Sequence, residues 1–164
     1  MCDKIFLIAD THFNHTNIIR YCNRPFSSIG QMNETLVDNW NSTVGPSDTV
    51  YFLGDLCMGD PKIWLDKLNG EIRFIRGNHD GELRKIRNTR ENIVLQVGLE
   101  HIMLVHAVEY LRGPWNGWII HGHHHNNNVK EFPLVNKKSK TLNVSVEMIN
   151  YRPIELGELL KLRN

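Results

Sequence analysis

The chain has 164 residues, enough to bury a real core but few for two domains, so we expect one domain over residues 1–164. Its 19 Lys and Arg nearly balance 18 Asp and Glu, which argues against a long polyanion as an obligatory partner. Three scattered cysteines, Cys2, Cys22 and Cys57, fit neither a disulfide framework nor CxxC zinc spacing. The first apolar run is too short for a signal peptide or a membrane span, so we expect a cytoplasmic protein with no membrane partner.

Short apolar runs of strand length recur along the chain, and each stops at residues that can bind a metal. Runs rich in Ile, Val, Phe and Tyr, bounded by glycine and polar groups, predict buried strands. With their polar ends, the five runs span residues 4–12, 49–55, 71–80, 101–107 and 118–125. In layered α/β proteins ligands collect beyond the carboxyl ends of the strands, so we expect the five polar ends to meet in one place.

Helical patterns separate the first three of these runs. Ser28 is predicted to cap one helix, because Gln31 occupies the capping-box position and apolar residues follow at offsets that suit one helix face. A strand, a helix and the next strand in this order imply right-handed crossovers and a locally parallel sheet.

A second helix is predicted to start at the Asp60-Pro61 pair and to end at Asn69-Gly70. After residue 91 the helical spacing fades, and strand-like runs dominate until residues 155–162. An α/β half followed by a mostly β half predicts an α/β (α+β) fold, in which two sheets pack together with helices on the outside.

Each polar residue at a strand end has an ordinary explanation as a cap or a turn residue when it is taken alone. Together, the carboxylates, one amide and several imidazoles supply a mixed set of oxygen and nitrogen ligands. This set suits Mn, Fe, Ni or Zn rather than a metal selected by thiolates. The successive strand ends therefore predict a metal site.

Five blocks occur in a fixed order: Asp10-x-His12, Gly54-Asp55, Gly77-Asn78-His79-Asp80, His106 and Gly122-His123-x-His125. This order resembles the calcineurin-like metallophosphoesterase family. The surrounding residues 10–26 and 143–154 further resemble a small uncapped branch found in bacteria and phages. The resemblance implies a four-layer sandwich of two packed mixed β-sheets flanked by helices.

The resemblance also implies two divalent metal ions, with Mn²⁺ expected first and Fe, Ni or Zn as alternatives. By position it assigns one metal to Asp10, His12 and His125, the other to Asn78, His106 and His123, and a bridging role to Asp55. In a rival register His121 and His123 form the histidine pair, but the family's glycine precedes both ligands. His124 is expected to point away from its neighbours, since side chains alternate in an extended chain.

The implied reaction is hydrolysis of a phosphodiester or phosphomonoester. A hydroxide bridging two cations roughly 3.5–4 Å apart would attack in line. His79 resembles the family histidine that hydrogen-bonds the phosphoryl group or protonates the leaving oxygen, and Asp80 is expected to orient it. Candidate substrate contacts follow the first strand, with loop capping as an equal alternative: Asn14, His15 and Arg24.

The expected partner is a phosphate-ester substrate, with nucleotides among the candidates. A catalytically silent metal-binding scaffold or adaptor of the same fold is the alternative, and the completeness of the five blocks favours the enzyme. A basic stretch over residues 76–90 lacks the interleaved aromatics of single-strand binders, so no obligatory nucleic-acid partner is expected. Cys57 is interpreted as a buried small hydrophobe.

Overall fold

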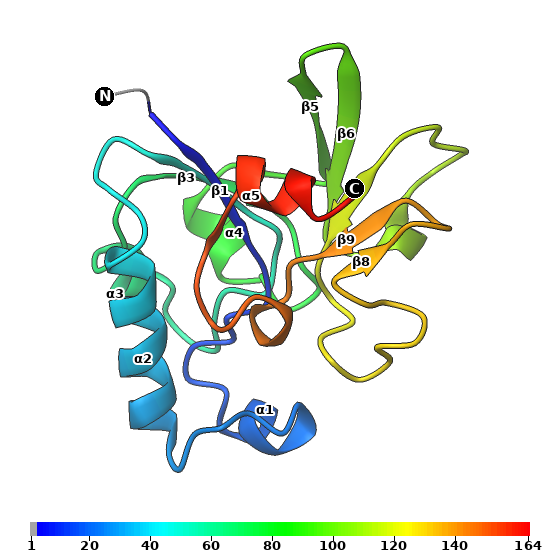
Figure 1. The fold of residues 1–164 in the computed structure, drawn as a ribbon. Helices are drawn as coiled ribbons and strands as arrows, with labels where there is room; N and C mark the ends of the chain where they lie inside the picture. The colour runs from blue at the N-terminus through cyan, green and yellow to red at the C-terminus, as the bar shows by residue number, and fades with distance from the viewer. Residues whose placement is uncertain (1–2) are drawn as a thin grey trace.

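The computed structural model describes residues 3–164, and within this range the strands form two five-stranded sheets (Figure 1). The strand orders are β10-β1-β2-β3-β4 and β5-β6-β7-β9-β8. Both sheets mix parallel and antiparallel pairs. The predicted pair of mixed sheets is therefore confirmed, whereas Cys2 lies outside the described residues.

The first sheet comes mainly from the first half of the chain. Its strands are β1 (Ile5–Ile8), β2 (Thr49–Phe52), β3 (Glu71–Ile75), β4 (Thr89–Arg90) and β10 (Ile154–Glu155). β1 to β4 run parallel, as the alternation of strands and helices predicts, and β10 pairs antiparallel with β1. Leu7, Ile8, Val50 and Phe52 are buried, as expected for parallel strands covered on both faces.

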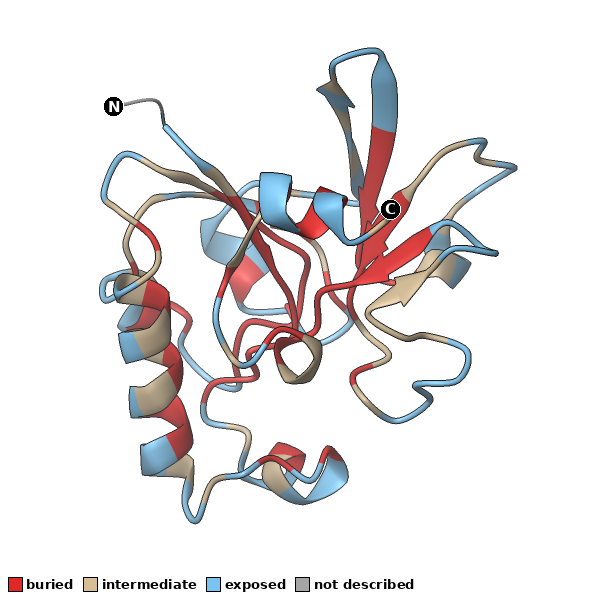
Figure 2. Cartoon of the chain, in the orientation of Figure 1, coloured by how far each residue is buried: buried red, intermediate tan, exposed pale blue. Residues whose placement is uncertain are grey.

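The described residues form five short or medium α-helices. These are α1 (Thr16–Tyr21), α2 (Ile29–Asn41), α3 (Lys62–Leu65), α4 (Leu83–Ile86) and α5 (Leu156–Lys161). α2 carries a buried stripe on one side and an exposed face on the other (Figure 2). The stripe consists of Met32, Leu36 and Trp40 with the polar Asn33, at the spacing of an amphipathic helix.

The predicted start of α2 is confirmed, but its capping differs in detail. Ser28 Oγ accepts a hydrogen bond from Gln31 N at 3.1 Å, which satisfies one free amide of the first turn. Gln31 Oε1 accepts from Ser27 N at 2.7 Å rather than from Ser28 N. The side chain thus ties down the residue before the cap instead of completing a capping box.

The second predicted helix is shorter than expected, because α3 ends at Leu65 and does not reach Asn69-Gly70. Asn69 is held by the region that follows α2. Its amide donates to Asn41 Oδ1 at 2.9 Å and its side chain donates to Val44 O at 3.1 Å. These contacts draw the chain out of the helix, and no sequence propensity encodes them.

The second sheet comes from the second half of the chain. Its strands are β5 (Asn92–Val97), β6 (Glu100–Val105), β7 (Ile119–His121), β8 (Val135–Asn136) and β9 (Thr141–Asn143). β6, β7 and β9 run parallel, and the outer strands β5 and β8 are antiparallel to their neighbours. β6 and β7 therefore end at the same edge of the sheet, which places their polar ends together.

One apolar core joins the two sheets, since Phe52 of the first and Leu104, Ile120 and Leu142 of the second belong to the same buried cluster. Each fully buried Leu or Ile stabilises the fold by roughly 1.5–3 kcal/mol. The far face of β6 and β7 is covered mainly by the 3-10 turn Val108–Tyr110 and the loop after it, not by an α-helix. Within residues 3–164 no helix is long and apolar enough to cross a membrane.

Candidate metal centre

The polar ends of β1, β2, β3, β6 and β7 meet in one place, as the repeated pattern of the sequence predicts. Backbone hydrogen bonds stitch the loops together: Asp10 N donates to Gly54 O at 2.9 Å, and Gly122 N donates to His106 O at 2.9 Å. A side chain adds a third link, because His123 N donates to Asp10 Oδ2 at 2.8 Å. The five blocks thus form a single constellation.

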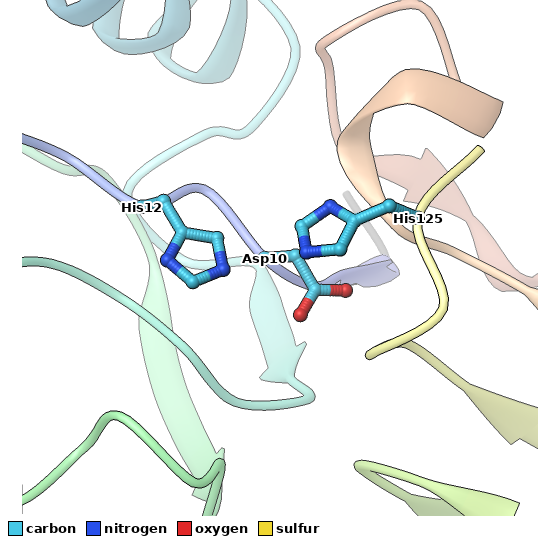
Figure 3. Close-up of side chains that lie close together, drawn as sticks. All are labelled: Asp10, His12 and His125. Carbon is cyan, nitrogen blue, oxygen red and sulfur yellow. The ribbon is translucent and has the colours of Figure 1, made fainter. Parts of the chain in front are cut away.

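Asp10, His12 and His125 form what we call the first group. Each offers one ligand atom, and these three atoms lie within 4.8 Å of one another. Figure 3 shows the Asp10 carboxylate between the imidazole rings of His12 and His125. The residues are 0%, 2% and 8% exposed, so the first group is shielded from solvent.

Asp55, His106 and His123 form the second group, whose ligand atoms also lie within 4.8 Å of one another. Leu53 O lies 2.6 Å from His106 Nδ1, and a carbonyl only accepts, so Nδ1 carries the proton and Nε2 is left for a ligand. His106 Nε2 lies 3.0 Å from Asn78 Oδ1, which places the amide beside this group.

Asp55 belongs to the second group and also reaches the first. Its Oδ2 is 3.6 Å from His12 Nε2 in the first group and 3.5 Å from His106 Nε2 in the second. Its other oxygen accepts a hydrogen bond from His79 N at 2.8 Å, which fixes the carboxylate. A single oxygen near both groups is the geometry that a bridging ligand requires.

Five residues of the two groups have left-handed backbone, with φ of 61° at Asp10, 50° at His12, 63° at Asp55, 70° at His123 and 49° at His125. Such conformations cost about 1–3 kcal/mol each for non-glycine residues and cluster at functional sites. The packed sheets must therefore hold these loops against their own preference.

Two glycines permit the close approach of the loops. A Cβ at Gly122 would lie 2.5 Å from Asp10 Oδ2, and a Cβ at Gly77 would collide with Asp55 Oδ1. Any larger residue at either place would displace a carboxylate of the two groups. The glycine before the histidine pair is thus required by the nearness of Asp10.

The residues present fit divalent cations. Asp10 Oδ1 is buried and has no hydrogen-bond partner among residues 3–164, and such an atom in a folded protein calls for a partner such as an ion. The donor set consists of carboxylate oxygens and imidazole nitrogens, which suit Mn, Fe, Ni or Zn. Burial, then the charge of His125, lowers the pKa of His12 far below its ordinary value, so this imidazole stays neutral and able to coordinate.

His125 has the opposite balance. Burial lowers its pKa, but the Asp10 carboxylate and contacts with Cys22 and Glu147 outweigh burial and raise the pKa to about 11. A cation at the first group therefore competes with a proton on His125.

His79 lies exposed at the mouth of the centre, with its ring centroid 5.5 Å from that of His12. The expectation that Asp80 orients His79 is wrong. Both Asp80 oxygens are occupied by backbone amides: Oδ2 accepts from Asp55 N at 2.9 Å and from Gly77 N at 2.8 Å, and Oδ1 accepts from Leu56 N at 3.0 Å. Asp80 therefore locks two ligand loops together.

The three candidate substrate contacts have different surroundings. The His15 ring centroid lies 5.3 Å from that of His12, so His15 borders the first group. Asn14 is exposed, and its Oδ1 accepts from Asn33 Nδ2 at 2.9 Å. The interpretation of Arg24 as a substrate contact is wrong, because its side chain is fully buried and its guanidinium donates to Asp10 O, Thr11 O and Glu147.

The remaining histidines of the cluster lie outside both groups. His121 is buried, and its Nδ1 lies 2.9 Å from Gly122 O. His124 points away from both groups. Its ring stacks on Phe132 with the two centroids 3.5 Å apart, and its Nε2 lies 3.1 Å from a carboxylate oxygen of Glu109. The geometry thus favours His123 and His125 as the pair over the rival register.

The sequence patterns missed Glu147, whose carboxylate oxygens lie 3.0 and 3.1 Å from His125 Nδ1. They also missed two exposed aromatic rings beside the centre. The ring centroid of Tyr21 lies 6.2 Å from that of His15, and the ring centroid of Tyr110 lies 6.0 Å from that of His123. Cys57 is buried as predicted, and burial raises its pKa to about 12.

No protein-family model matches the sequence. Uncharacterized protein MJ1445 of Methanocaldococcus jannaschii is 51% identical over 166 residues, which cover 97% of this chain and 90% of that protein. Gene 66 protein of Mycobacterium phage L5 is 34% identical over 79 residues, or 44% of this chain and 38% of its own length.

Two solved structures share the fold. The protein of unknown function AQ665 from Aquifex aeolicus has a TM-score of 0.74 and 24% identity, covering 98% of this chain and 100% of its own. The phosphoesterase YfcE from E. coli has a TM-score of 0.50 and 17% identity, covering 94% of this chain and 82% of its own. Two mixed sheets with clustered Asp and His at their common edge define the metallophosphoesterase fold. The chain belongs to the same family as the Methanocaldococcus jannaschii protein, and it has the calcineurin-like metallophosphoesterase fold.

Proposed function

We propose that the protein is a dinuclear metal-dependent phosphoesterase. The observation that carries this proposal is the position of Asp55 Oδ2, 3.6 Å from His12 Nε2 and 3.5 Å from His106 Nε2, between two separate sets of oxygen and nitrogen donors. Two divalent cations, Mn²⁺ first among them, would neutralise the charge of a phosphoryl group and lower the pKa of water.

The chain's own side chains supply the rest of the chemistry. His79 stands exposed at the mouth while its backbone amide is fixed to Asp55, so its ring can deliver a proton to a leaving oxygen. The Asn78 amide lies beside His106 and adds a donor oxygen without adding a negative charge that would repel a phosphate. Asp80 acts through the loops, because it holds the amides of Asp55 and Gly77 in place.

The surroundings of the centre favour phosphodiesters with aromatic groups, such as nucleotides. Tyr21 and Tyr110 are 56% and 48% exposed, and they lie beside histidines of different parts of the centre. Aromatic faces of this kind stack with nucleobases. Arg24 is withdrawn into the interior, so it is not free to neutralise the second charge of a phosphomonoester.

The test is a screen of metal-free protein reconstituted with Mn²⁺, with bis(p-nitrophenyl) phosphate, p-nitrophenyl phosphate and cyclic nucleotides as substrates. We expect hydrolysis that depends on Mn²⁺, with diesters ahead of the monoester, and none from Asp10→Asn treated in the same way. A wild-type protein that holds two metals yet hydrolyses none of these esters would favour the scaffold or adaptor instead.

A further inference from the structure

Arg24 and Glu147 form a buried ion pair behind the first group. Their side chains are 0% and 1% exposed, and both Arg24 Nε and the terminal Nη2 lie 2.8 Å from Glu147 Oε1. Burying such a pair costs several kcal/mol of desolvation, and apolar replacements are often as stable. Stability alone therefore does not account for these two residues.

The pair is directed at two parts of the first group. Arg24 also donates to Asp10 O at 2.7 Å and to Thr11 O at 2.8 Å, within the segment where Asp10 and His12 have left-handed backbone. Glu147 contacts His125 Nδ1 with both oxygens, at 3.0 and 3.1 Å. One ion pair thus holds the backbone of one ligand loop and the ring of the ligand on another.

The contact with Glu147 decides which nitrogen of His125 faces the first group. An ionised carboxylate only accepts hydrogen bonds, so Nδ1 must carry a proton, and Nε2 is the nitrogen that can coordinate once a cation displaces any proton from it. Arg24 favours the ionised form of Glu147, because its guanidinium donates to the same oxygen.

Cys22 offers a competing arrangement for a cation. Its sulfur and one ligand atom each of His125 and Glu147 also lie within 4.8 Å of one another. A cation bound there would lie against the Arg24 guanidinium, which already occupies a Glu147 oxygen at 2.8 Å. Repulsion between two buried positive charges argues against this use of Glu147.

We propose that Glu147, held by Arg24, is a positioning residue that fixes the Nδ1–H form and the ring orientation of His125 and so strengthens cation binding at the first group. The proposal deepens the proposed function, since it assumes that the first group binds a cation. Outer partners of ligand histidines typically contribute 10- to 100-fold in metal affinity. In the second group, the near contact of His106 Nδ1 is the neutral Leu53 O at 2.6 Å, and the carboxylate oxygen Asp10 Oδ1 lies farther away at 4.0 Å.

The test compares Glu147→Gln with the wild type in two measurements. Calorimetric titration of metal-free protein with Mn²⁺ is expected to show about 10- to 100-fold weaker binding in one of two sites, with the other unchanged. Proton NMR without metal is expected to show a slowly exchanging Nδ1 proton of His125 in the wild type and its loss in Glu147→Gln. Glu109→Gln, which alters an exposed carboxylate 3.1 Å from His124, is the matched control and should change neither.

An unchanged Mn²⁺ isotherm, or equal weakening of both sites, would overturn the proposal. If Glu147→Gln fails to fold, the double variant Arg24→Met with Glu147→Leu removes both charges, and it should fold yet show the same selective loss. A wild-type protein that binds no Mn²⁺ would refute the proposed function. The Nδ1 proton of His125 would then still show whether Glu147 positions the ring.

Discussion

The two groups of the candidate metal centre are built differently, although each joins one carboxylate to two imidazoles. In the first group all three residues are buried, and His125 is backed by the Glu147–Arg24 ion pair. In the second group His123 is only partly buried, and His106 is backed by the neutral carbonyl of Leu53. The neighbouring Asn78 is exposed.

This difference assigns the two groups different tasks. A buried group whose ligands are held from behind is already arranged for its cation, so we expect tight binding and slow exchange there. The second group opens toward Tyr110 and the solvent, so we expect it to bind its cation more weakly and to receive the substrate. Asp55 connects the two, and its replacement is the strongest test of the comparison.

Asp55→Asn is expected to reduce hydrolysis to the background rate and to lower the metal content from two equivalents. The amide keeps the shape of the side chain but removes the charge shared between His12 and His106. Metal analysis after reconstitution with Mn²⁺ measures the content. A wild-type protein that holds one equivalent of metal, with the same content in Asp55→Asn, would show that no pair of ions is bridged by Asp55.

Substitutions in the histidine cluster should separate the two groups. His125→Ala is expected to remove the tight Mn²⁺ site and His123→Ala the weak one, and each should abolish nearly all metal-dependent hydrolysis. His124→Ala is the matched control, because His124 packs on Phe132 outside both groups, and it should retain most activity. Loss of a site in His121→Ala, with His125→Ala unaffected, would instead establish the rival register.

His79→Ala leaves both groups intact and should slow hydrolysis by about 10²- to 10⁴-fold, the usual contribution of a general acid. Both metals should remain bound. The loss should be larger for a poor leaving group such as an alkyl alcohol than for nitrophenol, because a weakly basic oxygen needs no proton. Equal losses on both would indicate that His79 steadies the phosphoryl group rather than protonating the leaving oxygen.

The smallest expected effect is on stability in mild acid. Burial lowers the pKa of His121 from 6.5 to about 4, so the unfolded chain binds more protons between these values. The stability of metal-free protein is therefore expected to be fully present above pH 6.5 and to fall as the pH drops from there toward 4. The free energy of unfolding of His121→Asn, measured with denaturant, should fall less steeply with decreasing pH than that of the wild type. Parallel curves for the two proteins would show that His121 does not cause the loss of stability.

The strands and most residues of the two groups were predictable, because each apolar run ends in a polar residue at the same edge of a sheet. The supporting contacts were not. Arg24 and Glu147 are 123 positions apart, and their pairing exists only once the two sheets have packed. Asp80 looked like a partner of the adjacent His79, but its oxygens meet amides of two separate loops. The early end of α3 depends in the same way on contacts of Asn69 with a distant segment.

Anomalous diffraction from crystals soaked in Mn²⁺ tests the central claim most directly. The account predicts two peaks on either side of Asp55, one beside Asp10, His12 and His125 and the other beside His106 and His123. At limiting Mn²⁺ the first of these should fill before the second. A single peak, or a peak between Cys22 and Glu147, would contradict the claim that Asp55 joins two cation sites.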